Sequence, residues 1–139
     1  MSSQNIKTII DSINAHGKMR LKAPATETEI NSFETKYGIN LPEQYKEWLL
    51  FSDGGELFLP AGFQLYGVSH CPIIDMHDMW CPDEKYLVIG AMSWGDSILC
   101  EKDSEAISIY NHETGKIEPD EVYACFYNFL ETASHFCYT

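Results

Sequence analysis

The stretch TETEINSFETKYGINLPEQYKEWLLFSDGG, residues 26–55, contains start and stop signals for two consecutive helices. Thr26 and Glu29 fit the S/T-x-x-E capping box, in which a hydroxyl and a carboxylate each accept a hydrogen bond from a backbone amide at a helix N-terminus. Gly38 stands where a left-handed C-terminal cap is favoured. The spacing therefore predicts a helix over residues 27–37. Its apolar face carries Ile30, Phe33 and Tyr37.

The second helix is predicted over residues 42–51, because Pro42 suits the first helical position and Asp53-Gly54-Gly55 ends the pattern. The two helices are expected to form a compact hairpin. The apolar side chains on their facing sides are predicted to have mainly structural roles: Phe33, Tyr37, Leu41, Tyr45, Trp48 and Leu49.

The pattern of residues 26–55 resembles the SUKH superfamily. The shared features are a capped helix with a Phe-Glu pair, then Tyr-Gly, Leu-Pro, a later tyrosine, an apolar pair and Asp-Gly-Gly. The matching residues are Ile30, Phe33, Glu34, Tyr37, Gly38, Leu41, Pro42, Tyr45, Leu49, Gly54 and Gly55, with a looser continuation at Phe63, Leu65, Tyr66 and Gly67. The order of the later elements extends the resemblance over most of residues 25–131.

Members of this superfamily include bacterial immunity proteins and fungal cell-wall-assembly regulators. The resemblance therefore implies a non-enzymatic binding module. Many of the toxins that the superfamily counters are nucleases, which makes a nuclease-type toxin domain the implied partner.

The rest of the chain predicts further helices and a sheet. Residues 5–15 and 122–135 have the apolar stripes of amphipathic helices, and residues 72–80 read as a short helix or turn. Alternating or continuous apolar runs predict strands near residues 57–59, 63–68, 86–92, 97–101 and 106–110. We expect residues 1–139 to form one α+β domain, with a mixed, mainly antiparallel sheet of about five strands and about four helices.

Charge and composition restrict the partners. With 9 basic and 21 acidic residues, the formal net charge is −12, which opposes binding to nucleic acid and to anionic membranes and favours a basic protein. Acidity can also serve solubility alone. No apolar run approaches a membrane span, no secretory signal is recognised, and the five cysteines are expected to be reduced thiols of a cytoplasmic protein. A monomer or weak homodimer is expected.

Two arrangements resemble enzymatic sites. Ser93 lies in A-x-S-x-G, a variant of the nucleophile elbow, but that motif requires a helix directly after the serine, whereas residues 96–102 read as turn and strand. His70, Cys71, His77 and Cys81 are residue types that bind zinc, but their spacing fits no established zinc motif. We therefore predict no catalytic residue, no metal and no cofactor, and keep a small hydrolase or metal enzyme as an alternative.

Acidic residues interleaved with aromatic ones form the predicted partner-binding site. Tryptophan is enriched at binding hot spots, and acidic groups beside it steer cationic partners. The predicted site is Asp78, Trp80, Trp94 and Asp96, and the second choice is the loops around Asp53, Glu56, Glu113 and Asp120. Acids in turns are ordinarily solvated, and the sequence shows no sign that these are buried.

The sequence thus predicts an immunity protein that neutralises a basic toxin domain by occlusion. The first alternative is an intracellular scaffold or regulatory module of the cell-wall-regulator type, which would use the same fold without a toxin.

Overall fold

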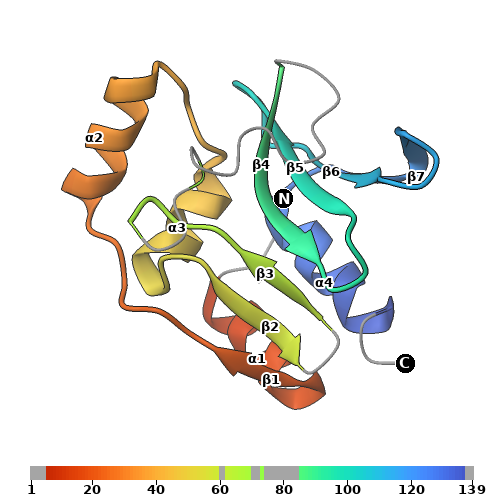
Figure 1. Ribbon diagram of the computed structural model, residues 1–139. Helices are drawn as coiled ribbons and strands as arrows, with labels where there is room; N and C mark the ends of the chain where they lie inside the picture. Colours follow the sequence, from red (N-terminus) through yellow and green to blue (C-terminus); the bar gives the residue numbers. More distant parts are fainter. Residues whose placement is uncertain (1–5, 60–61, 70–72, 74–84, 137–139) are drawn as a thin grey trace.

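The computed structural model describes residues 6–59, 62–69, 73 and 85–136. Figure 1 shows the elements that these residues form. The helices are α1 (Ile6–His16), α2 (Glu27–Tyr37), α3 (Glu43–Phe51) and α4 (Phe126–Phe136). The strands are β1 (Lys18–Arg20), β2 (Gly55–Leu59), β3 (Phe63–Leu65), β4 (Tyr86–Met92), β5 (Ser97–Glu101), β6 (Ile107–Asn111) and β7 (Lys116–Tyr123).

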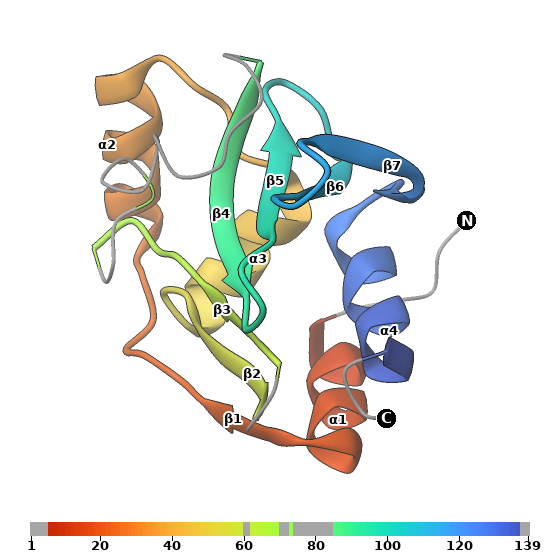
Figure 2. The same ribbon diagram turned by 45° about the vertical axis from the view of Figure 1, so that its right-hand side comes forward.

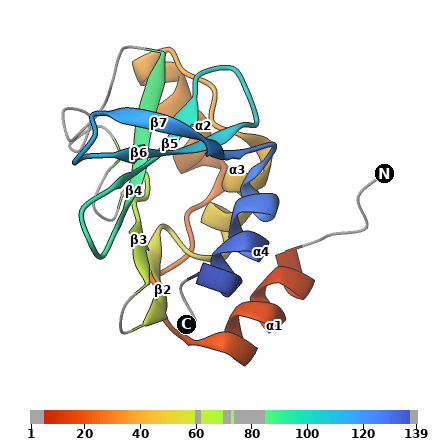
Figure 3. The ribbon, with the colours of Figure 1, turned by 90° about the vertical axis from the view of Figure 1, so that its right-hand side faces the viewer.

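The seven strands form one sheet in the order of the sequence, and each described neighbouring pair is antiparallel. The sheet twists strongly, so that β6 and β7 cross the direction of β4 in Figure 3. Helices α1 and α4 contact each other, and α4 also contacts α3 and β7. The fold is thus an α+β domain, as the sequence predicts.

The capping signals of α2 are confirmed. The Glu29 backbone N–H donates to the Thr26 hydroxyl at 3.1 Å, and the Thr26 N–H donates to the Glu29 carboxylate at 2.9 Å. Gly38 adopts the left-handed conformation, with φ of 65°, and caps the C-terminus. The start of α3 differs by one position from the prediction, because Pro42 has ψ of 139° and is the N-cap rather than the first helical residue.

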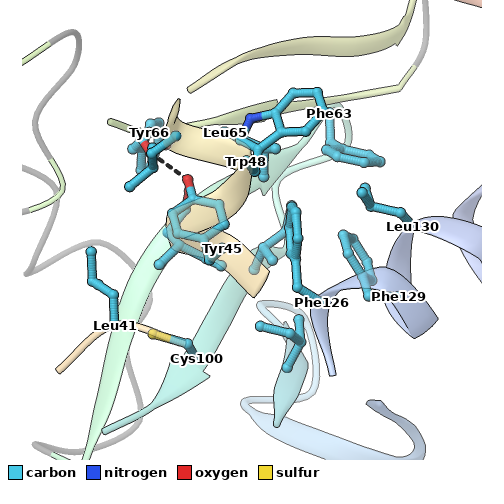
Figure 4. Packing of buried hydrophobic residues seen from close by; sticks show 14 of the residues in the cluster. Leu41, Tyr45, Trp48, Phe63, Leu65, Tyr66, Cys100, Phe126, Phe129 and Leu130 are labelled. Atoms are coloured by element: carbon cyan, nitrogen blue, oxygen red, sulfur yellow. Dashed lines mark hydrogen bonds between the residues drawn. The ribbon is translucent and has the colours of Figure 1, made fainter. Parts of the chain in front are cut away.

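Most of the helix-pair residues lie in the core, as predicted. Trp48 and Tyr45 have no exposed surface and lie between α3, the sheet and α4 (Figure 4). The Trp48 indole N–H donates to the Gly54 carbonyl at 2.9 Å, and the Tyr45 hydroxyl donates to the Tyr66 carbonyl. Tyr37 differs from the prediction, because it is 37% exposed, although its ring contacts the Phe33 ring with 5.0 Å between the ring centroids.

Asp53 is buried, which overturns its role as a second-choice partner-binding residue. Its carboxylate accepts hydrogen bonds from the backbone N–H groups of Val68 at 2.7 Å and Ser69 at 2.9 Å. A carboxylate can be buried when backbone donors satisfy it. Asp53 therefore ties the end of α3 to the segment after β3 and is structural.

The sheet has seven strands instead of about five, because the sequence analysis missed β1 and most of β7. Helix α4 begins at Phe126 instead of residue 122, since Val122 belongs to β7, where its side chain is 49% exposed. Both strands lie at the edges of the sheet, where neither an apolar face nor an alternating pattern is needed. Pro119 is also tolerated at such an edge.

Candidate functional site

The turn between β4 and β5 presents the two predicted site residues that the structure describes, Trp94 and Asp96. The Met92 N–H donates to the Asp96 carbonyl at 2.8 Å, and the Gly95 N–H donates to the Met92 carbonyl at 3.0 Å. Gly95 has φ of 106°, and a Cβ there would lie 3.0 Å from the His112 ring. A glycine is therefore needed for the tight turn and for the histidine beside it.

Asp96 is 7% exposed, so the expectation of a solvated acid is wrong here. Its Oδ1 accepts a hydrogen bond from the His112 backbone N–H at 3.2 Å and lies 2.6 Å from His112 Nδ1. Its Oδ2 accepts a hydrogen bond from the Trp94 indole N–H at 3.2 Å. Asp96 thus joins the β4–β5 turn to the β6–β7 turn and orients the indole ring, which is 49% exposed.

A pocket of about 420 Å³ opens beside Trp94. Strands β4, β6 and β7, which can be followed in Figure 2, and the β4–β5 turn supply its lining. Three buried apolar residues, three carboxylates and the exposed indole share that lining: Met92, Ile109, Tyr123, Asp96, Asp120, Glu121 and Trp94. The lining includes no lysine or arginine, so the described pocket is negatively charged.

Glu121 is the least compensated of these acids. Among the described residues, its Oε2 is enclosed and has no hydrogen-bond partner, although the residue as a whole is half-buried. Burial raises the pKa of the Glu121 carboxyl, and the negative charges of Asp96, Asp120 and Glu118 raise it further. The folded protein therefore keeps an unfavourable negative charge in the pocket near neutral pH.

We expect Glu121→Gln to raise the melting temperature at pH 7 and to have a smaller effect near pH 4. A raised folded-state pKa contributes stability below the unfolded-state pKa, and this contribution is lost as pH rises through the folded value. The neutral amide removes that loss. Melting temperatures of both proteins across this pH range test the prediction, with exposed Glu113→Gln as the control. A Glu121→Gln variant that is less stable at pH 7 would show that the carboxylate supports the fold.

The other residues predicted to bind a partner or a metal lie in different parts of the chain. Asp78 and Trp80 lie outside the described residues, as do His70, Cys71, His77 and Cys81. Glu56 lies 3.4 Å from Arg20 in a partly exposed pair, Glu113 is exposed, and Asp120 lines the pocket. Glu121 and His112 are not among the predicted site residues, because the pairing of β5, β6 and β7 brings them to the β4–β5 turn and its pocket from positions distant in sequence.

The features that resemble enzymatic sites gain no support. Ser93 lies in the hairpin turn and is followed by β5, whereas a nucleophile elbow leads into a helix. Within the described part of the chain, no group of three or more His, Cys, Asp or Glu side chains is placed to hold a metal ion. Cys100 and Cys125 are free thiols, and Cys100 is buried. No helix in the described ranges is long and apolar enough to cross a membrane.

These features define an acidic α+β domain with an open, negatively charged pocket. Residues 24–132 match the SMI1 / KNR4 family (SUKH-1), and the chain belongs to this family, which confirms the resemblance seen in residues 26–55. It is also similar to the uncharacterized protein YnaB of Bacillus subtilis (strain 168), with 35% identity over 69 residues. That match covers 50% of this chain and 45% of YnaB, so the chain spans less than half of that relative's length.

Proposed function

We propose that this protein is an immunity protein that binds a cognate toxin domain and neutralises it by occlusion. Membership of the SUKH-1 family supports a binding role, since the superfamily includes immunity proteins. The observation that carries the proposal is the pocket beside Trp94, whose lining combines an exposed indole with three carboxylates and no lysine or arginine. An aromatic anchor with surrounding charge is typical of protein-binding hot spots.

The electrostatics favour a basic partner such as a nuclease-type toxin. A nuclease needs a positively charged groove for phosphates, and a protein with a net charge of −12 is its complement. Opposite charge steers the two proteins together and speeds association at low salt. Binding across the groove would exclude the nucleic acid substrate, so no catalytic group is required of the immunity protein.

Co-purification with the cognate toxin domain tests the partner assignment. The expected result is a one-to-one complex whose association slows as salt is raised, together with protection of cells that express the toxin. A protein that neither binds this toxin nor protects cells would contradict the proposal and favour a scaffold or regulatory role.

Within such a complex, Trp94→Ala is expected mainly to speed dissociation, at a cost of about 2 kcal/mol, because a rigid aromatic anchor is lost. Asp120→Lys is expected mainly to slow association and to weaken its dependence on salt, because Asp120 is exposed at the rim. Surface plasmon resonance at several salt concentrations separates the two effects.

Asp96 is unsuited to this steering test, since a lysine there would break the hydrogen bonds to Trp94 and His112. Glu113→Lys is the matched control for an exposed acid outside the pocket lining. Wild-type kinetics in both Trp94→Ala and Asp120→Lys would place the interface elsewhere.

A further inference from the structure

We propose that the pocket beside Trp94 binds the guanidinium group of an arginine side chain presented by the partner protein. The indole of Trp94 would provide the stacking face, and the carboxylates of Glu121 and Asp120 would accept the hydrogen bonds. This inference rests on the proposed function in one respect: the arginine is assigned to the toxin domain.

The hydrogen bonds around Asp96 indicate which carboxylates are left for a ligand. Both oxygens of Asp96 are engaged, Oδ1 by His112 and Oδ2 by the indole of Trp94. In contrast, Glu121 Oε2 is enclosed without a partner among the described residues, and Asp120 is exposed beside it in the lining. A cation in the pocket would compensate the negative charge of the Glu121 carboxylate, which the nearby acids leave uncompensated.

The shape of the pocket favours a long, flat cation. Its volume of about 420 Å³ lies within the range of small-ligand sites, about 300–1,000 Å³. Buried apolar side chains at Met92, Ile109 and Tyr123 suit an aliphatic stem, while the exposed ring of Trp94 suits a planar cation stacked on its face. A guanidinium is planar, weakly hydrated and able to donate to two carboxylates at once.

The other occupants fit less well. A purely apolar side chain would leave Glu121 both buried and without a partner, which is costly. A divalent metal needs several oxygens converging on one point, and the described carboxylates form no such group. A lysine ammonium provides charge but neither the flat face nor the two-pronged donor geometry.

Asp96 has a positioning role in this site. Its hydrogen bond to the indole N–H restrains the ring beside the pocket, and its contacts with His112 hold the turn in place. The stacking surface is therefore set before the ligand arrives, which lowers the entropic cost of binding.

The test uses the full chain and a short glycine peptide that contains one arginine, followed by NMR through the indole N–H resonances. A matched peptide carries citrulline, which has nearly the same shape without the charge. We expect the Trp94 signal to shift saturably with the arginine peptide while the buried Trp48 signal stays in place. Citrulline should bind about tenfold more weakly or worse, because the ionic hydrogen bonds are lost.

Glu121→Gln should lower the affinity for the arginine peptide by about tenfold. Glu113→Gln, which lies outside the pocket lining, should leave this affinity unchanged. Should Glu121→Gln fail to fold, Asp120→Asn removes the other proposed carboxylate, at the rim of the pocket, and should likewise lower the affinity for the arginine peptide. Equal binding of the arginine and citrulline peptides, equal binding of a lysine peptide, or a saturable shift of Trp94 by MgCl₂ at lower concentration than by the arginine peptide would each overturn the inference.

The peptide result separates this inference from the proposed function. Toxin neutralisation by a protein whose pocket does not bind the arginine peptide would overturn only the arginine site. Conversely, arginine binding by a protein that neutralises no toxin would leave the site intact and remove the immunity role.

Discussion

Trp48→Ala is expected to lower the free energy of unfolding by about 4–5 kcal/mol, which is a large part of the stability of a small domain. The side chain has no exposed surface, packs against Phe51 and Phe126, and donates its N–H to the Gly54 carbonyl. Removing the ring leaves a cavity between α3 and α4 that the surrounding elements can close only in part. Urea denaturation followed by circular dichroism measures the change.

Trp94→Ala is the matched control, because the same ring is deleted from a site where it is 49% exposed. Its expected cost is only about 1 kcal/mol, mainly the hydrogen bond to Asp96. The Gly54 carbonyl keeps a second donor, the Ser52 hydroxyl at 2.9 Å, so the cost of Trp48→Ala comes mostly from packing. Equal losses in the two variants would contradict the described core.

Asp53→Ala is expected to cost about 3 kcal/mol, because two partly buried backbone N–H groups lose a buried acceptor, at about 1–3 kcal/mol for a donor left without a partner. These donors belong to Val68 and Ser69, which follow β3, so the link between α3 and the sheet is lost. Denaturant titration at neutral pH gives the value.

Asp53→Asn is expected to have an intermediate effect, since its amide oxygen can accept one hydrogen bond while its NH₂ group faces the second donor. Exposed Glu113→Ala should change stability by about 0.5 kcal/mol or less and controls for the loss of one negative charge. An Asp53→Ala variant as stable as the Glu113→Ala variant would contradict the structural role of Asp53 and make it a candidate for partner binding again.

Local signals in the sequence predict the helices well. The capping box of Thr26 and Glu29 and the cap at Gly38 are determined within one helix, and the structure confirms them. The continuous apolar run of β4 likewise predicts a central strand. These patterns depend on neighbours close in the chain, so they can be recognised without knowing the fold.

The edges of the sheet cannot be predicted in the same way. Strand β1 has only three residues, two of them exposed, and β7 contains Pro119 and several acids. Neither strand carries a continuous apolar face, so only pairing with β2 and β6 reveals them. The sequence predicts too early a start for the final helix for this reason, since apolar Val122 fits its stripe although it belongs to β7.

The candidate site was predicted in part. The sequence indicates Trp94 and Asp96 as an aromatic–acid pair in a turn, and the structure places them together at one pocket. Burial of Asp96 and Asp53 is not evident from the sequence, because His112, which donates to Asp96, and the two residues that donate to Asp53 lie 15 to 16 residues further along the chain. Glu121 reaches the pocket only through the register of β6 and β7.

The central proposal is stoichiometric neutralisation of a toxin without catalysis. Its most direct test adds the purified protein in increasing amounts to a fixed amount of the cognate toxin domain, at concentrations well above the dissociation constant. We expect toxin activity to fall linearly and to reach zero at one equivalent. Full inactivation by far less than one equivalent would indicate an enzyme, and undiminished activity at a large excess would contradict the immunity role.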